Sequence, residues 1–367
     1  MFGSHLSIAG SMVNALDEGA SLGLDTVQVF TKNQQQWNAK PLDPGMVRDW
    51  RARVAALGWD HGCDDDRGGL SRGRIVSHAS YLINLASVNP ELWRKSVDLM
   101  TDEIERCEAL GIPFLVHHPG SFVGADLGTG IANIARAYAE LARRTPGYGT
   151  LLCLEGTAGA GSQIGGPFEH LSALRAAIVS AGFDSARVGY CLDTCHLHAA
   201  GHDLRTRRSA GEVLERFDAL CGLEHLRVLH VNDSKGALGS KLDRHAQIGE
   251  GEIALDPAPE VLGQSGFAVF LNHPRLARIP KVLETPKGLG KGRVPFDTVN
   301  LNRLRALVGL APVKAPADPG PTSLSASKER ARTTPRATGK PKARPTKSRP
   351  PPRKKNGGKA GGKGSRD

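Results

Sequence analysis

Eight short apolar runs alternate with longer amphipathic segments between Phe2 and about Leu310, and this alternation restricts the possible folds more than any other feature. Each run is apolar enough to form a strand that is buried on both faces, as the strands of a parallel sheet are. The runs are residues 2–8, 26–31, 74–79, 114–118, 151–155, 188–193, 227–233 and 281–285. Strands joined by helices in this way predict a single α/β domain, a parallel (β/α)8 barrel of the TIM type.

An open, doubly wound α/β sheet is the alternative fold for such an alternation. No glycine-rich phosphate-binding sequence follows the first run, which disfavours that fold. Three amphipathic segments also end alike, in LGL at 22–24, LGW at 57–59 and LGI at 110–112. The glycine in each permits the left-handed backbone that ends a helix shortly before a strand.

The positive charge of the chain is concentrated in residues 312–367. The whole chain carries a formal charge of +11, whereas this segment alone holds 16 Lys+Arg and 3 Asp+Glu, a balance of +13. It is rich in Pro, Lys, Arg, Ala and Gly and nearly lacks large apolar residues, so we predict that it is disordered. We therefore divide the chain into a barrel, residues 1–311, and a basic tail, residues 312–367.

Several features predict a cytoplasmic protein that does not interact with membranes. No apolar run is long enough to cross a bilayer, and the N-terminal sequence MFGSHLSIAG does not resemble a signal peptide. The six cysteines, at positions 63, 107, 153, 191, 195 and 221, have no paired spacing, so we interpret them as reduced thiols.

Potential metal ligands end six of the predicted strands. These residues are His78, His118, Glu155, Asp193, His230 and Glu284. Active sites of parallel barrels are built at the carboxyl ends of the strands, so all six are expected on one rim. One histidine at a strand end would usually be structural, but six such residues predict a metal site.

Three further residues join this set: His196, Asp243 and His245. The spacing of Asp193 and His196 suits two metal ligands, but it suits an aspartate that caps a helix equally well. The other strand ends favour the ligand interpretation. Five histidines and four carboxylates are too many for one tetrahedral ion and suggest two or three ions. Such ligands suit Zn²⁺, and Mn²⁺ or Fe²⁺ would also fit.

A series of motifs in this order resembles the endonuclease IV family of apurinic/apyrimidinic (AP) endonucleases, which belongs to the xylose isomerase-like TIM barrel superfamily. The resemblance runs from about Phe2 to Leu310. The motifs are FGSHLSIAG (2–10), FTKNQQQW (30–37), HASYLINL (78–85), HHPGS (117–121), LEGTAGAGSQIG (154–165), CLDTCHLHAAGHDL (191–204), HVNDSKGALGSKLDRHAQIGEG (230–251) and LETPK (283–287).

The resemblance implies a DNA-repair hydrolase that holds three zinc ions. One ion would be bound by His78, His118 and Glu155, with Glu155 bridging to a second ion that is also bound by Asp193, His230 and Glu284. The third would be bound by His196, Asp243 and His245. Among these ligands, His118, Glu155 and Glu284 are expected to be catalytic. The implied reaction is hydrolysis of the phosphodiester 5′ to an abasic site, which leaves a 3′-hydroxyl and a 5′-deoxyribose phosphate.

The resemblance also implies a monomer that binds double-stranded DNA with abasic sites. Gln35, Tyr81 and Leu82 match positions that contact the DNA near the lesion. Tyr81 and Leu82 are equally consistent with core residues at the start of a helix. The basic tail is expected to contact DNA non-specifically, although it is also consistent with a solvated extension.

The sequence departs from the family pattern at several positions. Gln35 stands where some members have an arginine that inserts into the duplex. Gly156 stands where many have Asn or Thr, so a hydrogen bond to a ligand is expected to be missing. His198 and His202 replace usual aromatics, and we expect a packing residue and a surface residue, respectively.

Two other groups of polar residues are not expected at the site. Residues 60–74 form a long polar link that contains His61, Cys63 and Asp64–Asp66. These side chains could bind a metal, but we interpret the link as a solvated acidic loop on the N-terminal face of the barrel. His117 neighbours His118 on a strand, so its side chain must point outward among the helices.

Two other functions remain possible at this point. A sugar isomerase or epimerase of the same superfamily would use metal on the same rim, but it needs only about four ligands. A non-catalytic DNA-binding protein would be expected to have lost ligands, whereas the set is complete here.

Overall fold

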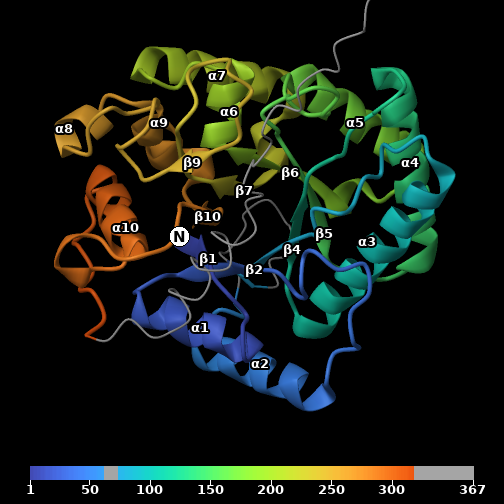
Figure 1. Ribbon diagram of the computed structural model, residues 1–367, viewed down its shortest axis with the longest axis horizontal. Coiled ribbons are helices and arrows are strands. Elements are labelled where there is room, and N and C mark those ends of the chain that lie inside the picture. The colour runs from blue at the N-terminus through green and yellow to red at the C-terminus, as the bar shows by residue number, and fades with distance from the viewer. Residues whose placement is uncertain (62–72, 318–367) are drawn as a thin grey trace, which may run out of the picture.

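The computed structural model describes residues 1–61 and 73–317, and its eight parallel strands close into a barrel (Figure 1). Around the barrel the strands follow the chain order, and the last of them, β10, pairs with β1. They are β1 (Phe2–His5), β2 (Thr26–Val29), β3 (Val76–His78), β4 (Phe114–His117), β5 (Leu151–Glu155), β6 (Val188–Asp193), β7 (Leu226–His230) and β10 (Lys281–Leu283). Each overlaps the apolar run predicted for it, so the predicted barrel is confirmed.

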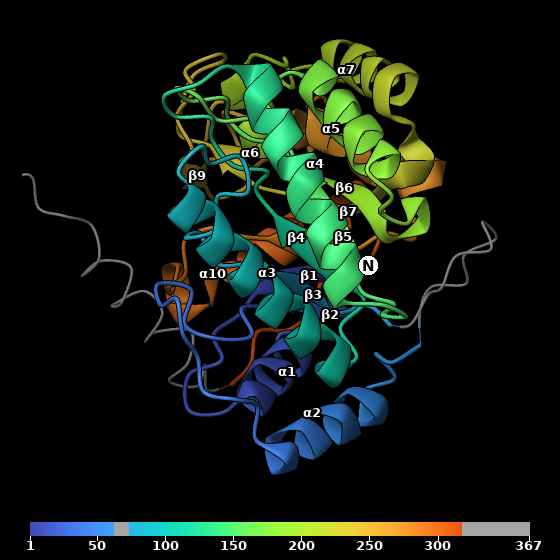
Figure 2. The same ribbon diagram turned by 90° about the vertical axis from the view of Figure 1, so that its right-hand side faces the viewer.

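Helices surround the strands, and α3, α4 and α5 run side by side along one flank of the barrel (Figure 2). The α-helices are α1 (Met12–Ser21), α2 (Pro44–Ala56), α3 (Pro90–Leu110), α4 (Leu127–Arg144), α5 (Phe168–Ser180), α6 (Thr194–Ala200), α7 (Arg207–Cys221), α8 (Pro259–Leu262), α9 (Gly266–Asn272) and α10 (Phe296–Leu307). Short 3-10 turns lie at Ser185–Arg187, Leu223–His225, Pro274–Leu276 and Lys291–Arg293. A small antiparallel hairpin, β8 (Asp233–Ser234) and β9 (His245–Ala246), follows β7.

Local sequence sets several helix boundaries. Asn89 caps α3 by accepting hydrogen bonds from the backbone N–H groups of Glu91 and Leu92, and Pro90 occupies the first turn, where no N–H is needed. The three predicted helix-ending glycines, Gly23, Gly58 and Gly111, have φ of 72°, 66° and 70°. These left-handed values confirm the prediction made from the repeated LG motifs.

The interior of the barrel contains two successive layers of side chains, because alternate strand residues point inward. The lower one, here called the apolar layer, consists of Val76, Val116, Cys153, Cys191, Val228 and Val282, all of them buried. The upper one, here called the polar layer, consists of His78, His118, Glu155, Asp193, His230 and Glu284. Each member of the polar layer lies two residues beyond a member of the apolar layer, on the same strand or, for His118 and Glu284, directly after it.

The residues that alternate with these layers point outward and form the main core between strands and helices. His117 follows this rule: its Nε2 lies 2.6 Å from the hydroxyl oxygen of Tyr138 on α4. The prediction that His117 lies among the helices is therefore confirmed. Burial lowers the pKa of this imidazole to about 4.

The chain beyond α10 is attached to the N-terminal face of the barrel. The backbone N–H of Val313 donates to Asn302 Oδ1 at 2.8 Å, and Asn302 Nδ2 donates to the Val313 carbonyl at 3.0 Å. The Val313 side chain lies over Gly23, in the link that precedes β2. The tail is thus rooted at the end of the barrel opposite to the polar layer. The tail was predicted to be disordered, and from Asp318 onward it lies outside the described part of the chain.

Two other predictions touch undescribed residues. Residues 62–72 of the polar link lie outside the described ranges, as does Cys63, whereas His61 is exposed. The other five cysteines are free and buried. Within residues 1–61 and 73–317, no helix combines the length and the apolar character that crossing a bilayer requires.

Candidate metal centre

The nine predicted ligands lie together at the carboxyl ends of the barrel strands, in three groups that share or adjoin members. The first group is His78, His118 and Glu155; the second is Glu155, Asp193, His230 and Glu284; the third is His196, Asp243 and His245. Within each group, one ligand atom of every residue lies within 4.8 Å of the others. Strand geometry explains this proximity for the polar layer, because neighbouring parallel strands place equivalent inward residues side by side.

Glu155, at the end of β5, joins the first two groups. Its Oε2 lies 3.0 Å from His78 Nε2 and 3.1 Å from His118 Nε2. Its Oε1 lies 2.9 Å from His230 Nδ1. The two oxygens of one buried carboxylate therefore face two different sets of imidazoles, which is the arrangement that a bridging ligand needs.

The third group lies beside the barrel mouth. Asp243 Oδ1 is 3.2 Å from His196 Nε2 and 3.5 Å from His245 Nε2. His196 is on α6, directly after β6, while His245 begins strand β9 of the hairpin. The long segment after β8 thus brings Asp243 and the first residue of β9, His245, close to the helix that carries His196.

Asp193 both caps a helix and faces the centre, which answers the question raised by its spacing to His196. Its Oδ1 accepts hydrogen bonds from the backbone N–H groups of Cys195 at 2.6 Å and His196 at 3.1 Å, at the start of α6. Its Oδ2 lies 3.5 Å from His245 Nε2 and 3.9 Å from His230 Nδ1. The two interpretations of this motif are compatible, because each uses a different oxygen.

The imidazole rings are held by hydrogen bonds at the nitrogen remote from the centre. The Nδ1 atoms lie close to backbone carbonyl oxygens: His78 to that of Ala79 at 2.8 Å, His196 to that of Gly156 at 2.9 Å and His245 to that of Glu284 at 3.1 Å. A carbonyl can only accept, so each Nδ1 carries the proton and each Nε2 presents its lone pair. This is how metal-binding histidines are commonly oriented.

Buried charges perturb the acid–base behaviour of the centre. Burial lowers the pKa of the His230 imidazole, but the carboxylates of Glu284 and Glu155 raise it further, to about 9 overall. Burial likewise opposes ionisation of Glu155, yet His118 and His230 hold its pKa well below the usual range. Ionisable groups that shift one another's pKa values in this way are found more often at functional sites than in ordinary packed cores.

These side chains fit zinc on chemical grounds. Imidazole nitrogen and carboxylate oxygen are the ligand types that Zn²⁺, Mn²⁺ and Fe²⁺ share. His245 Nε2 is buried and has no hydrogen-bond partner in the described structure, as expected of an atom that binds an ion. Cys191 and Cys195 also lie near the groups, but burial raises the pKa of both thiols, which disfavours the thiolate needed for binding.

Three residues that the sequence analysis did not select support the predicted ligands. Gln28, on β2, accepts from His230 Nε2 through its Oε1 at 2.8 Å, and its Nε2 donates to Glu284 Oε1 at 2.7 Å. His5 Nδ1 is 2.9 Å from Gln28 Nε2 and 3.3 Å from Glu284 Oε1. The sequence signal that could have identified Gln28 and His5 was a polar side chain at an inward-facing position of an otherwise apolar strand.

Asn232 is the third of these residues. Its Nδ2 donates to Asp193 Oδ2 at 2.7 Å, and its Oδ1 accepts from the backbone N–H of Glu284 at 2.7 Å. One amide therefore joins the ends of β6 and β10. Because only acidic residues, histidines and cysteines were considered as ligands, an amide beyond β7 was overlooked.

The family departure at Gly156 has a different consequence from the one expected. A side chain at this position would point toward Leu192 and Leu171, outside the barrel interior. The backbone carbonyl of Gly156 itself orients His196. The expectation of a missing hydrogen bond to a ligand was therefore wrong, since a side chain here would point away from the centre.

The two substituted histidines differ from each other. His198 is buried and fills a packing position, as expected. His202 was expected at the surface, and this was wrong: it is 9% exposed and stacks on Phe168 with ring centroids 4.2 Å apart. Its Nε2 lies 3.1 Å from the Gly166 carbonyl oxygen, so this imidazole keeps the hydrogen bond that a buried polar group needs.

The three expected DNA-contacting residues have different environments. Tyr81 is 58% exposed and lies beside His78 and His118, with ring centroids 5.4 and 6.3 Å away. Gln35 is exposed, whereas Leu82 is half-buried and packs against the core. The core interpretation is therefore wrong for Tyr81 and partly correct for Leu82.

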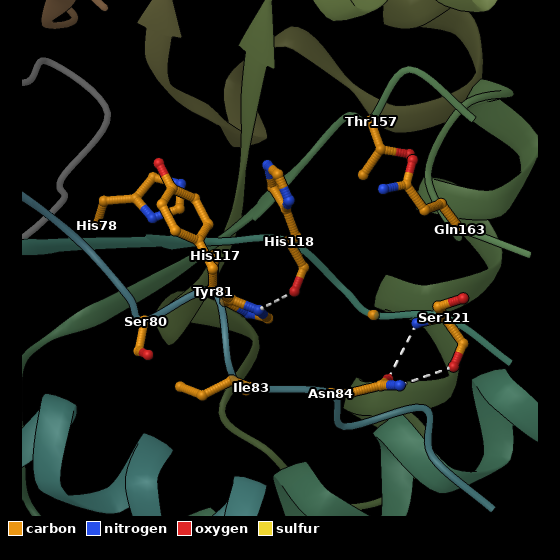
Figure 3. A pocket seen from close by; sticks show the side chains of 11 residues that line it. His78, Ser80, Tyr81, Ile83, Asn84, His117, His118, Ser121, Thr157 and Gln163 are labelled. Carbon is orange, nitrogen blue, oxygen red and sulfur yellow. Dashed lines mark hydrogen bonds between the residues drawn. The ribbon is translucent and has the colours of Figure 1, made fainter. Parts of the chain in front are cut away.

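A cavity of about 200 Å³ opens next to Tyr81 (Figure 3). His78, Tyr81 and His118 line one end of it. Asn84 lines the other end and is hydrogen-bonded to the backbone of Ser121. The candidate metal centre is thus continuous with a space lined mainly by neutral polar groups.

Comparison with known proteins gives consistent matches. A family model described as Xylose isomerase-like TIM barrel matches residues 16–273. A protein of Chloroflexus aurantiacus named probable endonuclease 4 is 39% identical over 307 residues, which cover 84% of this chain and 98% of that protein. The crystal structure of endonuclease IV from Thermus thermophilus is 35% identical with a TM-score of 0.67, over 84% of this chain and 98% of that one. A D-tagatose 3-epimerase-like protein, 19% identical with a TM-score of 0.55 over 90% of this chain and 99% of that one, shares the fold.

Proposed function

The chain belongs to the endonuclease IV family, and from that premise we propose that it is a DNA-repair hydrolase that cleaves the phosphodiester 5′ to abasic sites. The expected products carry a 3′-hydroxyl and a 5′-deoxyribose phosphate. The observation that carries the proposal is the presence of three adjoining donor groups at one rim, two of them joined by Glu155.

The donor groups are suited to three zinc ions. His78, His118 and Glu155 would hold one, Glu155, Asp193, His230 and Glu284 a second, and His196, Asp243 and His245 a third. Bound there, zinc would polarise phosphate oxygens and make water a stronger nucleophile near neutral pH. Mn²⁺ or Fe²⁺ at one position is compatible with the same donors.

The chain's own residues prepare this site. Gln28 and Asn232 fix the orientation of His230, Glu284 and Asp193, so the donors do not have to reorganise during the reaction. The apolar layer closes the barrel beneath them and excludes water from below. Glu155, Glu284 and His118 are the donors that we expect to lie nearest the reacting phosphate.

The position of the centre inside the barrel mouth supports selectivity for abasic sites. A backbone phosphate reaches buried donors only if its nucleotide leaves the duplex stack, and a nucleotide without a base leaves at little cost. The exposed Tyr81 and Gln35 lie on loops beside the mouth, where a distorted duplex would meet them. Leu82, being half-buried, is expected to support Tyr81 rather than to enter the duplex.

The test is incubation of the purified protein with a duplex oligonucleotide that contains one abasic site, with and without a chelator, followed by mapping of the ends. We expect incision 5′ to the site, abolished by the chelator and slow or absent on intact duplex. A 3′-unsaturated sugar would indicate β-elimination and contradict hydrolysis. Chelator-sensitive isomerisation of a keto-sugar, without incision, would instead support the epimerase-type activity.

The tail is proposed to bind DNA without sequence specificity. Residues 318–367 contain 15 of the 16 basic residues of segment 312–367, and neutralised phosphates release bound counterions. Deleting 318–367, which retains Val313 on the barrel, should raise the KM for DNA and flatten the salt dependence of binding. The single-turnover rate at saturating DNA should not change, because uniform binding affects KM alone. An unchanged salt slope would assign the tail to another partner.

We also propose that the enzyme acts as a cytoplasmic monomer. The closed barrel has no free sheet edge that would need a second subunit, and the five described cysteines are free. Sedimentation of the full chain at micromolar concentration tests the oligomeric state, and a dimer would contradict the proposal.

A further inference from the structure

Two loops border the candidate metal centre on the side of Tyr81. The first rim loop, residues 30–40, follows β2 and carries Gln35. The second rim loop, residues 79–88, follows β3 and carries Tyr81. Phe30 and Tyr81 contact each other edge to face, with ring centroids 5.6 Å apart, so the loops meet beside the centre.

One buried carboxylate outside the metal centre contacts both loops. Glu103, on α3, is only 1% exposed. Its Oε2 accepts a hydrogen bond from the Thr31 hydroxyl at 2.8 Å, and its Oε1 accepts one from the backbone N–H of Ser80 at 3.2 Å. Each oxygen of the carboxylate therefore holds a different rim loop.

Neighbouring groups on α3 hold the first rim loop as well. Arg106, one turn along the helix, donates to the Lys40 carbonyl at 2.5 Å and to the Thr31 carbonyl at 3.4 Å. Lys32 is buried and donates to the Trp37 carbonyl at 3.1 Å. The bonds from Arg106 attach both ends of the loop to α3, whereas the bond from Lys32 lies within the loop and stabilises its shape.

A direct bond then joins the two loops. The Ser80 hydroxyl donates to the Gln34 carbonyl at 2.7 Å, next to the residue expected to reach the DNA. The backbone N–H of the same serine is bonded to Glu103. Glu103 and this direct bond therefore both act through Ser80, so loss of the Glu103 bond loosens the residue that links the loops of Gln35 and Tyr81.

Burial of a carboxylate at this position costs free energy unless its hydrogen bonds compensate for the lost hydration. Burial raises the pKa of Glu103, which is the sign of a desolvated carboxyl group. An apolar side chain of similar size at this position of α3 would pack against the rim loops without that cost. Its placement is explained by the two donors that it satisfies, one from each loop.

We infer that Glu103 is a positioning residue for DNA binding, which fixes the separation of the two rim loops before the duplex arrives. This inference rests on the proposed function, since it assumes that Gln35 and Tyr81 contact DNA. Preorganised loops avoid an ordering cost on binding, so the effect should appear in affinity. No donor of the metal centre is bonded to Glu103 itself. The connection is indirect, through the Ala79–Ser80 peptide, whose N–H is bonded to Glu103 and whose carbonyl orients His78. Metal content is therefore measured beside affinity, and we expect it to be retained because the His78 ring is also held by Glu155.

The chain offers a matched control on the same helix. Glu108 accepts hydrogen bonds from the backbone N–H groups of Gly149 and Thr150, in the link that precedes β5. That link lies at the N-terminal end of the barrel, away from the rim loops. Glu108→Gln should therefore destabilise the fold in the same manner as Glu103→Gln, without touching the rim.

The experiment compares Glu103→Gln with Glu108→Gln in the metal-loaded full chain. A glutamine offers one acceptor oxygen in place of two, so Glu103→Gln can keep only one of the two bonds that Glu103 makes to the rim loops. We expect the KM for abasic duplex to rise about fivefold to tenfold in Glu103→Gln, the cost of one such bond. The single-turnover rate at saturating DNA and the metal content should be unchanged, and Glu108→Gln should retain the KM of the parent.

A second measurement does not depend on DNA. Trp37 lies in the first rim loop, and in a Trp93→Phe background it is the one tryptophan that is not buried. Acrylamide quenching of its fluorescence should increase in Glu103→Gln but not in Glu108→Gln. If the parent protein does not incise DNA, the proposed function fails while this measurement still decides whether Glu103 holds the loop.

Thr31→Val provides an independent variant, because it removes the hydroxyl donor and leaves the carboxylate intact. It should raise KM in the same direction, and the double variant should be less impaired than the sum of the two singles. The inference is overturned if Glu103→Gln and Glu108→Gln share the same KM and quenching. It is also overturned if Glu103→Gln loses metal or single-turnover rate.

Discussion

The apolar and polar layers of the barrel are built on the same six strands, and each pair of positions differs by two residues. Val76 and His78, or Val116 and His118, point the same way into the interior. Below, side chains of valine and cysteine pack without charge. Above, imidazoles and carboxylates lie close together, and all of them except the half-buried His118 are buried.

The difference shows how one scaffold separates stability from chemistry. The apolar layer gains free energy from burial and needs no partners. The polar layer is costly to bury, and each of its members depends on hydrogen bonds or opposite charges. Substitutions in the polar layer should therefore lower metal content and activity, whereas substitutions in the apolar layer should lower the free energy of unfolding. Four measurements test this difference.

The largest effect is expected for Glu155→Gln in the polar layer. The barrel should fold, since the change is nearly isosteric, but one oxygen that faces the imidazoles becomes an amide. If this carboxylate bridges two ions as proposed, its loss should remove metal and lower the rate of incision by at least about a thousandfold. Elemental analysis and steady-state kinetics measure both. Full metal content in an inactive protein would rule out the bridging role.

Gln28→Leu tests whether the polar layer depends on residues that bind no metal. The variant removes the acceptor for His230 Nε2 and the donor to Glu284. Affinity for zinc should fall about tenfold to a hundredfold, measured by competition with a chromophoric chelator. Val27→Ala, whose side chain lies in the outer core of the same strand, is the control and should retain the affinity. Equal losses in both variants would contradict an orienting role.

Val116→Ala tests the apolar layer two residues before His118. Removal of two buried methyl groups should lower the free energy of unfolding by about 2 kcal/mol, from lost burial and a small cavity. Below the melting transition, metal content and kcat should remain within about twofold of the parent. Denaturant titration and kinetics at low temperature provide the comparison. Loss of metal without loss of stability would show that the layers are not separate.

The smallest effect is a pH dependence confined to the polar layer. The pKa of His230 is raised in the fold from its ordinary 6.5 to about 9. Its stabilising contribution is therefore fully present below pH 6.5 and is lost as the pH rises through 9. In chelator-treated protein the melting temperature should decline across this interval, while zinc affinity increases as the proton leaves. His230→Gln should remove this part of the decline, and an identical pH profile in the variant would contradict it.

Much of the barrel and of its rim is predictable from the sequence, because both depend on local patterns. Strand periodicity, helix-ending glycines and polar residues at strand ends act over a few residues. The location of six of the nine donors at one rim followed from that pattern, while His196, Asp243 and His245 lie outside the ends of the barrel strands. The three donor sets that the resemblance implied are among the groups that the structure brings together. Pairing of parallel strands then leaves little freedom in how the ends meet.

The supporting residues depend on contacts between distant segments and were missed for that reason. Gln28 bonds to residues 202 and 256 positions away. Whether His202 is buried depends on Phe168, on α5, and the direction in which a side chain at Gly156 would point depends on strand register. None of these can be read from neighbouring residues. Preference for ligand-type side chains also obscured the amides of Gln28 and Asn232, which orient the candidate ligands.

The double use of Asp193 limits how this protein can evolve. One oxygen begins α6 and the other faces the metal centre, so a mutation at this codon changes a helix boundary and a donor in one step. His196 and His245 would lose their common neighbour together. A lineage that relaxed its metal requirement could not discard this donor gradually, and a lineage that kept the helix would tend to retain the aspartate. This position should therefore be among the slowest to vary, independently of selection on the reaction itself.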